Sequence, residues 1–317
     1  MVKQQGIGKS HAKIILMGEH SVVYGQPAIA LPLPNVKLTV TIDQRADHAQ
    51  LVKSRYFAGP LGELPNNMLG IQKLINALVT KFAGQEDGWL LTIDSQLPAE
   101  RGMGSSAATA VAIVRAFFDY YEKALERDEL LKLADIEEQV THRSPSGLDA
   151  ATVSSAKPLY YIKGQAGKPI EMNLSATMVI ADTGVKGATK EAITSVQQLL
   201  KDQSDKAQAH IAHLGSLVNA ARDFLQVNEV IKLGTALDAA QVDLAALSVS
   251  DDSLDKLIKV AKLNGALGAK LTGGGRGGCM FAIMQTALGA RRLASILKES
   301  GAHQTWIQPL DQRGEEE

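Results

Sequence analysis

Apolar residues recur along the chain with two periods, and each period predicts one type of element. Between residues 66 and 82 they return every three or four positions, which is helical spacing, whereas residues 89–93 alternate like a half-buried strand. Helices are likewise predicted over residues 105–118, 128–140, 189–200, 206–225, 229–247, 254–263 and 287–297. Further strands are predicted over residues 13–17, 36–42, 160–162, 178–182, 279–284 and 304–307. The first two strands enclose a turn with Gly and Pro, which indicates an antiparallel region.

The length of the chain favours two domains. A chain of 317 residues, 45% of them hydrophobic, can bury a sizeable core and divide. We place the boundary after residue 174, which gives an N-terminal domain over 1–174 and a C-terminal domain over 175–317. The long helices after residue 186 could form a homodimer interface, although core packing explains them equally well.

Charge and cysteine content narrow the class of protein. Because 33 basic residues face 34 acidic ones, the chain has no charge excess for a nucleic acid or an anionic membrane. Cys279 is the single cysteine, so an intramolecular disulfide is excluded, and a buried position in a reducing compartment is expected. Residues 1–10 lack the apolar core of a signal peptide, and runs such as 107–114 are too short to span a bilayer. We therefore expect a soluble, cytoplasmic protein.

A glycine-containing segment, residues 98–107, lies between the strand at 89–93 and the helix that begins at Ser105. Gly102 and Gly104 let backbone N–H groups approach a phosphate, and the helix N-terminus adds about half a positive charge. The serines that follow can cap the helix or bind a metal ion. These features predict an anion cradle suited to a triphosphate, with a simple helix cap as the alternative.

The same segment also matches the relaxed dinucleotide-binding pattern, as Gly102-x-Gly104-x-x-Ala107. That pattern belongs on the first strand-to-helix turn of a βαβ unit, with an acidic residue about 20 positions further on. An antiparallel region precedes it here, so we favour the phosphate cradle over a dinucleotide site.

Three ionisable residues flank the first predicted strand. Lys13 begins the strand, and Glu19 and His20 follow the glycine turn after it. A strand end of this kind can present all three side chains toward a pocket. Taken singly, each has an ordinary explanation, because a lone lysine is usually solvated and a lone histidine is usually a hydrogen-bonded structural residue.

Two carboxylates are delivered by separate elements. Glu138 lies on the helix predicted over 128–140, and Asp149 follows a turn at residues 144–147. One carboxylate can hold Mg²⁺ while the other orients or deprotonates a hydroxyl group, which is the minimal acidic equipment for phosphoryl transfer. A surface helix followed by an Asx turn would explain the same residues without any chemistry.

A second glycine cluster, residues 273–278, precedes the strand predicted over 279–284. Its spacing also fits the dinucleotide pattern, but a strand follows where that motif requires a helix. We therefore predict a flexible loop that closes over phosphates.

Taken together, the segments at 13–30, 98–107 and 270–279 resemble the three signature motifs of the GHMP kinases, in the order of that family. The resemblance spans almost the whole chain. Within the family, residues 18–25 (Gly-Glu-His-Ser-Val-Val-Tyr-Gly) look most like the members that phosphorylate mevalonate, since galactokinases continue their Gly-Glu-His differently.

This resemblance implies a fold, a reaction and a set of site residues. The fold would be α+β in two domains, the first like the second domain of ribosomal protein S5 and the second ferredoxin-like, with ATP and Mg²⁺ as cofactors. Asp149 would accept or orient the proton of the mevalonate hydroxyl beside Lys13, while Ser106 and Glu138 would hold Mg²⁺. The nucleotide would contact Pro98, Glu100, Arg101, Gly102, Met103, Gly104, Ser105, Ser106 and Ala107. The substrate would contact Glu19, His20, Thr272, Gly273 and Gly274.

The chain departs from the family pattern at one place. The third motif of the family generally reads Gly-Ala-Gly-Gly-Gly-Gly, whereas Gly274 and Arg276 stand here at its second and fourth positions. Arg276 either adds a phosphate contact or restricts the loop, and the residues alone leave both open.

Two other functions fit parts of the pattern. A related kinase acting on phosphomevalonate or another small alcohol would share the phosphate-binding residues, and a non-catalytic sensor would share the fold. Retention of Lys13, Ser106, Glu138 and Asp149 argues against the sensor, which needs neither a base nor metal ligands.

Overall fold

The computed structural model describes residues 2–141 and 147–311, and they fall into two units whose segments alternate along the chain. Unit 1 comprises Met1–Lys13, Pro32–Ala99 and Gly104–Ser155, and unit 2 comprises Ile14–Leu31, Glu100–Met103 and Ala156–Glu317. The boundary predicted after residue 174 falls inside unit 2. The chain crosses between the units several times, so no single cut separates them.

The sheet of unit 1 has the order β4-β3-β5-β2, with β1 also paired to β2. Its strands are β1 (Gln5–Met17), β2 (Ala28–Arg45), β3 (Gln50–Lys53), β4 (Ala58–Pro60) and β5 (Gly88–Ser95). β2 pairs antiparallel with β5, and β3 pairs parallel with β5. Every second residue of β2 from Val36 to Ile42 is buried, which is the alternation of a strand with one face on a core.

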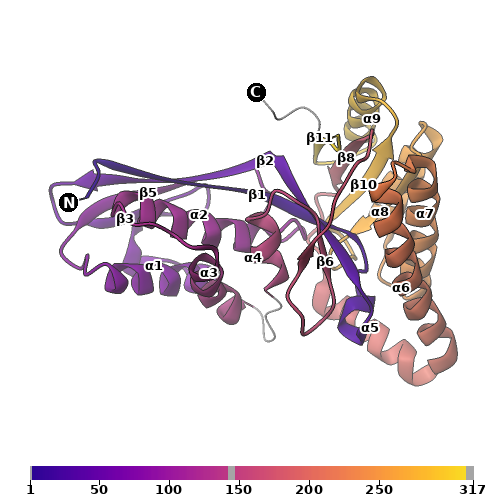
Figure 1. Ribbon diagram of the computed structural model, residues 1–317, viewed down its shortest axis with the longest axis horizontal. Helices are drawn as coiled ribbons and strands as arrows, with labels where there is room; N and C mark the ends of the chain where they lie inside the picture. Colours follow the sequence, from indigo (N-terminus) through magenta and orange to yellow (C-terminus); the bar gives the residue numbers. More distant parts are fainter. Residues whose placement is uncertain (1, 142–146, 312–317) are drawn as a thin grey trace. The chain divides into compact units, whose positions relative to one another are not determined.

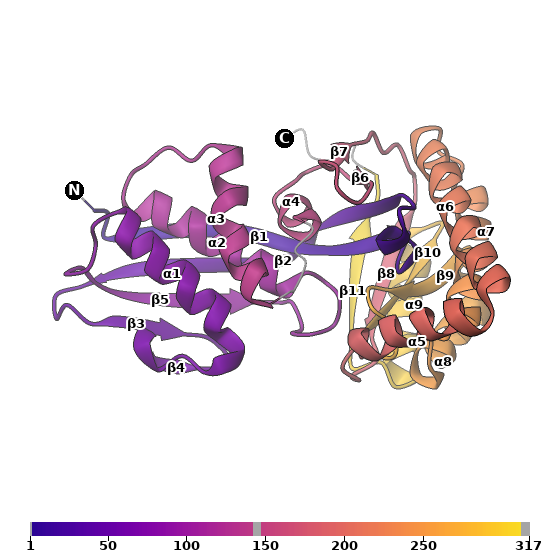
Figure 2. The same cartoon turned by 90° about the horizontal axis from the view of Figure 1, so that it is seen from below.

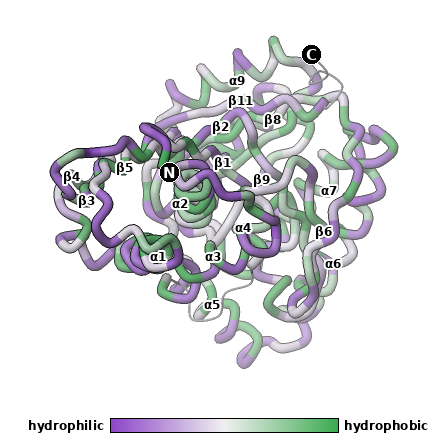
Figure 3. Tube along the Cα trace, turned by 60° about the vertical axis from the view of Figure 1, so that its left-hand side comes forward, coloured by the Kyte–Doolittle hydropathy of each residue, from purple (hydrophilic) through white to green (hydrophobic). Residues whose placement is uncertain are grey.

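Helices cover one face of this sheet, as Figure 1 shows for α1 to α3. They are α1 (Leu69–Lys81), α2 (Ser105–Tyr120), α3 (Arg127–Thr141) and the short α4 (Leu148–Val153); the 3₁₀ turns η2 (Leu61–Glu63) and η3 (Asn66–Met68) precede α1. α2 contacts α1, α3 and α4, and it is apolar over most of its length (Figure 3). It is therefore the central helix of the unit.

Two glycines of β1 let α2 approach the strand closely. A Cβ atom at Gly8 would lie 1.9 Å from the backbone oxygen of Ala112, and one at Gly6 would lie 2.6 Å from that of Ala116. Any side chain at either position would displace the helix. The glycines thus set the height of α2 above β1.

Unit 2 is built on an antiparallel sheet of order β11-β8-β10-β9. The strands are β8 (Thr177–Asp182), β9 (Gly268–Thr272), β10 (Cys279–Met284) and β11 (Gln304–Pro309). All residues of β8, β9 and β10 are buried, so these strands are covered on both faces. The first residues of β2 pair separately with β6 (Leu159–Tyr161), which pairs with β7 (Lys168–Pro169).

Helices of unit 2 pack around this sheet (Figure 2). They are α5 (Thr189–Asp202), α6 (Ser204–Gln226), α7 (Val230–Ala246), α8 (Asp252–Leu263) and α9 (Ala287–Glu299); the 3₁₀ turn η1 (Ser21–Tyr24) contacts α6. α7 packs closely against the start of β9: a Cβ atom on Gly268 would lie 2.2 Å from the backbone oxygen of Gly234, and one on Gly234 would lie 2.5 Å from that of Leu267. Further along both elements, the N–H group of Leu271 on β9 donates to Oε1 of Gln241 on α7 at 3.0 Å.

The predicted elements are largely confirmed, including the mixed α+β class. The sequence pattern missed β9 and α4, and it missed β3 and β4. Cys279 is fully buried as expected, and burial raises the pKa of its thiol well above the ordinary value. In the described part of the chain, no helix combines the length and apolar character that crossing a membrane requires. The predicted turn at 144–146 and the tail at 315–317 lie outside the described residues.

Because β1 and α2 approach so closely, a side chain added at their contact should destabilise the fold. Gly8→Ala should lower the free energy of unfolding by about 2 kcal/mol or more, because the new methyl group overlaps a helix backbone that cannot yield. Gly62→Ala is the matched control, since a Cβ atom there has no neighbour within 4 Å. Urea unfolding of both variants would measure the difference, and equal midpoints would contradict the packing described.

Candidate functional site

An ion pair joins Lys13 and Asp149 in unit 1. The Lys13 Nζ atom lies 2.8 Å from Asp149 Oδ1; the lysine side chain is 6% exposed and the aspartate side chain 33%. Asp149 belongs to the first turn of α4, which begins after Gly147 in the left-handed conformation. A buried ammonium group therefore holds a carboxylate that remains accessible to a ligand. The predicted neighbours are brought together.

The N-terminus of α2 lies beside the same lysine. Gly104 has φ 73°, and a Cβ atom on it would lie 2.8 Å from Lys13 Cγ. Glycine is needed here both for the left-handed backbone and for the close contact. Lys13 and the free N–H groups of the first helical turn together form a positive region, which suits an anion.

The hydroxyl group of Ser106 is bonded to a carboxylate on α3. It donates a hydrogen bond to Glu137 Oε1, whereas Glu138 is the neighbouring residue and is also buried. The described residues contain no group of three or more His, Cys, Asp or Glu side chains arranged to hold a metal ion. One hydroxyl and two carboxylates are nevertheless hard oxygen donors. They fit Mg²⁺, which commonly takes one or two carboxylates and completes its shell with substrate phosphates and water.

The middle of the predicted phosphate loop, Glu100–Met103, belongs to unit 2 and is anchored there by its charged side chains. Arg101 donates to Asp182 Oδ1 at 2.9 Å and to the backbone oxygen of Gly184 at 3.0 Å. Glu100, at φ 58°, forms an ion pair with Lys186. Both charged groups, predicted to bind the nucleotide, are thus engaged within the protein.

The other predicted nucleotide-binding residues divide between exposed backbone and buried side chains. Gly102 is exposed, and a Cβ atom on it would lie 3.2 Å from the Cα atom of Gly273 in the third glycine motif. The side chain of Met103 is buried, as is that of Ala107, while Pro98 and Ser105 are half-buried. This loop therefore exposes backbone groups to a ligand more than it exposes side chains.

Glu19 makes a fully buried ion pair with Lys270, a residue that the motif analysis gave no role. The Lys270 Nζ atom lies 2.5 Å from Glu19 Oε1, and both side chains are 0% exposed. Lys270 also donates to the backbone oxygen of Leu271 at 2.7 Å and lies over the ring of Phe281. Burial lowers the pKa of Lys270, and the charge of Glu19 opposes that shift. The pair ties the turn after β1 to β9.

His20 and Thr272 add two further links between the same segments. Nε2 of His20 lies 2.9 Å from the backbone oxygen of Gly274, and the Thr272 hydroxyl accepts from the N–H group of Ile15 and donates to its oxygen. Burial lowers the pKa of His20, so its ring is neutral at pH 7. Because a carbonyl oxygen can only accept, Nε2 carries the proton and Nδ1 is left as an acceptor.

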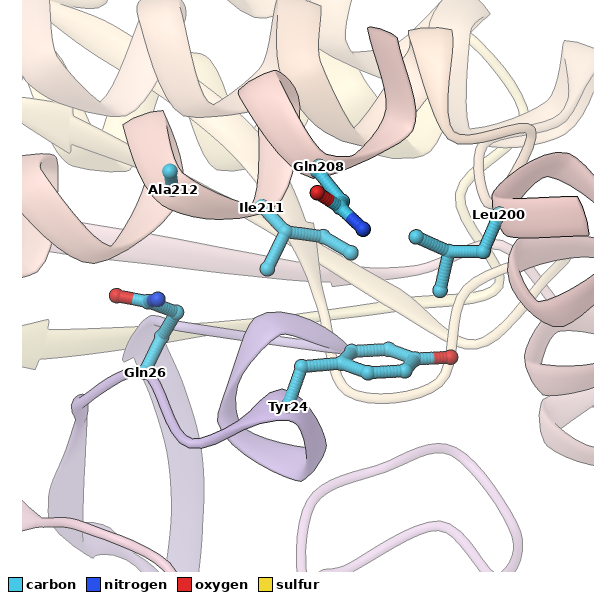
Figure 4. A pocket seen from close by; sticks show the side chains of 6 residues that line it. All are labelled: Tyr24, Gln26, Leu200, Gln208, Ile211 and Ala212. Carbon is cyan, nitrogen blue, oxygen red and sulfur yellow. The ribbon is translucent and has the colours of Figure 1, made fainter. Parts of the chain in front are cut away.

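A separate hollow of about 500 Å³ lies in unit 2 between η1, α5 and α6. Figure 4 shows its lining, which consists of Tyr24, Gln26, Leu200, Gln208, Ile211 and Ala212. None of these six side chains carries a charge at neutral pH. The hollow therefore lacks the groups that a phosphate or a carboxylate would need, in contrast to the residues around Lys13.

Sequence reasoning missed Lys270 and Glu137. Lys270 had a usable signal, since a lone lysine between the apolar residues Ala269 and Leu271 of a buried strand needs a buried partner. Glu137 had none, because adjacent residues on a helix point about 100° apart and only the packing of α3 decides which one faces Ser106.

Two family models match the chain. The model "GHMP kinases N terminal domain" matches residues 70–156, and the model "GHMP kinases C terminal" matches residues 218–303. The first match includes the predicted phosphate loop, Glu137 and Glu138 of α3, and Asp149. The second includes Lys270 and the third glycine motif.

Curated relatives and solved structures match over nearly the whole length. The chain is 32% identical to the mevalonate kinase of Thermococcus sibiricus over 87% of this chain and 88% of the relative. It is 34% identical to the crystal structure of mevalonate kinase from methicillin-resistant Staphylococcus aureus, with a TM-score of 0.78 and coverage of 97% and 99%. The crystal structure of L. major mevalonate kinase in complex with R-mevalonate has a TM-score of 0.85 at 24% identity and supports the fold alone; it covers 98% of this chain and 100% of that one.

Removing the lysine of the buried pair should cost much more unfolding free energy than removing the lysine of an exposed pair. Lys270→Met should cost about 3–5 kcal/mol of unfolding free energy, because it leaves the Glu19 charge without its counter-ion. Lys232→Met, which breaks the exposed Lys232–Glu229 pair, should cost less than about 1 kcal/mol. Denaturant unfolding of both variants checks this, and a similar small loss in both would show that the buried pair is not charged.

Proposed function

Because the chain belongs to the GHMP kinases, we propose that it is a cytoplasmic, Mg²⁺-dependent enzyme that transfers the terminal phosphate of ATP to the 5-hydroxyl group of mevalonate. The products are 5-phosphomevalonate, a precursor of isoprenoids, and ADP. The observation that carries the proposal is the ion pair between Lys13 and Asp149 beside the N-terminus of α2. The relatives that are more than 30% identical support the choice of mevalonate by their names.

Asp149 orients the acceptor hydroxyl group and takes its proton as the oxygen attacks phosphorus. Its carboxylate is partly exposed, so a substrate hydroxyl can reach it, and the ion pair with the Lys13 ammonium group holds the carboxylate in place. The lysine also offsets negative charge that spreads over the transferring phosphoryl group. Phosphoryl transfer passes through a loose transition state, so these two residues contribute alignment and charge rather than a covalent intermediate.

The first turn of α2 binds the phosphates of ATP. Its N–H groups have no acceptors within the helix, and Gly102 and Gly104 leave their backbone accessible. Since Glu100 and Arg101 are paired inside unit 2, they shape the loop rather than contact phosphate. Helix geometry and backbone donors thus supply the binding energy.

Ser106 and Glu138 hold Mg²⁺, and Glu137 orients Ser106. A hydroxyl group that donates its proton to Glu137 keeps its lone pairs available for a cation, which is the usual relation between a ligand and its supporting residue. When bound, the ion neutralises charge on the phosphates.

The acceptor is recognised by the turn after β1 and the start of the third glycine motif. His20 presents Nδ1 as an acceptor for a substrate hydroxyl group, while Glu19 fixes the turn through Lys270. Thr272 and Gly273 complete this part of the site, and the oxygen of Gly274 holds the histidine.

A substrate panel tests the reaction. Purified protein with Mg²⁺ and ATP should release ADP with mevalonate far faster than with phosphomevalonate or galactose. Faster turnover of phosphomevalonate would reassign the acceptor but keep the fold. Nucleotide binding without ADP release from any alcohol would favour the non-catalytic sensor instead.

Asp149→Asn should lower kcat for mevalonate by about 10²–10⁴-fold, because it keeps the shape of the side chain but removes the base. ATP binding measured by calorimetry should stay within about twofold of the parent. Asp223→Asn, at an exposed aspartate on α6, is the matched control and should leave both values unchanged. Near-normal turnover of the Asp149 variant would refute its role.

Glu138→Gln should raise the Mg²⁺ concentration for half-maximal activity by more than about tenfold, since it removes a charged ligand. Glu137→Gln should raise it less, because a neutral amide can still accept from Ser106. A Mg²⁺ titration of both variants at fixed ATP distinguishes them. The reverse order of effects would make Glu137 the ligand.

A further inference from the structure

Arg276 stands where the third motif of the family generally has glycine, and its side chain points to helices of unit 2. Its Nε atom donates to the backbone oxygen of Ser248 at 3.0 Å, and Nη2 donates to Ser195 Oγ at 2.8 Å. Its own N–H group donates to the oxygen of Val249 at 2.9 Å. The guanidinium group therefore fastens the loop to α5 and to the residues that follow α7.

The backbone of Arg276 is held in a conformation that glycine would adopt more easily. At φ 51° a non-glycine residue is strained. Hydrogen bonds from a charged donor are stronger than neutral ones, so the two side-chain bonds offset this strain.

The second departure from the family motif faces the same helix. A Cβ atom at Gly274 would lie 2.0 Å from Oγ1 of Thr189, the first residue of α5, so alanine would collide there. The N–H group of Ala188, just before the helix, donates to the oxygen of Arg276. Glycine at 274 and arginine at 276 together fit this loop to the start of α5.

This loop also carries the oxygen that orients His20. The Gly274 oxygen accepts from Nε2 of His20, and His20 itself lies at φ 59°. Movement of the loop by even 1 Å would stretch this bond and release the proton to either ring nitrogen. The contacts of Arg276 are thus connected to His20 through two residues of one short loop.

We infer that Arg276 is a positioning residue: by fastening the third glycine motif to α5 and to the residues that follow α7, it holds the Gly274 oxygen so that His20 presents Nδ1 to the acceptor alcohol. It does not act as a phosphate ligand. This inference rests on the proposed function for the identity of the alcohol, but the contacts of Arg276 do not depend on it.

The kinetic test separates the two substrates. Arg276→Gly should raise KM for mevalonate about tenfold and leave KM for ATP within about twofold; Ser195→Ala, which removes one acceptor, should give a smaller change in the same direction. Glycine suits the positive φ, so this variant removes the side-chain bonds without adding strain. Arg222→Ala, at a half-exposed arginine of α6, is the control and should change neither constant.

A double-mutant cycle tests whether the effect passes through His20. In a His20→Ala background, Arg276→Gly should have no further effect on kcat/KM for mevalonate, because its target is already gone. Effects that multiply would overturn the inference, as would a rise in KM for ATP alone, which would make Arg276 a phosphate ligand.

The tautomer of His20 can be measured without substrate, so this test does not depend on which alcohol is phosphorylated. The ¹⁵N chemical shifts of the His20 ring should show a proton on Nε2 in the parent and a mixture of both tautomers in Arg276→Gly. Amide hydrogen exchange at 273–278 should be faster in that variant. An unchanged tautomer and unchanged exchange would overturn the positioning role even if mevalonate is phosphorylated, whereas inactivity of the parent toward mevalonate would overturn the proposed function alone.

Discussion

The backbone of α2 rests directly on β1, and the candidate site of unit 1 depends on this contact. Gly6 and Gly8 leave no side chain between strand and helix, so the start of α2 arrives at Lys13, further along the same strand. Gly104 allows a similar close contact at the N-terminus of α2, where the Lys13 side chain occupies the space that a Cβ atom would need. Three glycines therefore place a helix dipole and an ammonium group next to each other, and the ammonium group in turn holds Asp149.

Three residues in the loops of unit 2 have strained backbone conformations. His20, Glu100 and Arg276 all have positive φ, which costs about 1–3 kcal/mol for each residue. Each is retained by a side-chain bond: His20 to the oxygen of Gly274, Glu100 to Lys186, and Arg276 to Ser195 and Ser248. Strain that is held by specific bonds fixes the direction of a loop more sharply than a relaxed backbone would, which suits a reaction that depends on alignment.

Periodicity predicted the long elements because their apolar faces are continuous. α2 and α8 were found in this way, whereas β9 was hidden by Lys270 inside an otherwise apolar strand, and α4 is too short to show a period. The neighbouring positions of Lys13 and Asp149 came from family resemblance and agree with the structure. The Glu19–Lys270 pair could not be read from the chain, since 251 positions separate its partners and only the fold brings them together.

Charge pairing within unit 2 limits the distance over which this nearly neutral chain could attract an anion. In unit 2 the loop charges are matched internally, as Arg101 pairs with Asp182, Glu100 with Lys186 and Lys270 with Glu19. Such pairs contribute little net field at a distance, because opposite charges a few ångströms apart cancel within a Debye length. What remains near the phosphate loop is the dipole of α2, which acts on a group at its N-terminus and decays within about one helical turn. Attraction of this short range acts only on an anion that is already at the helix N-terminus. In the proposed reaction the helix dipole would therefore help to seat a phosphate and would not steer the nucleotide from a distance.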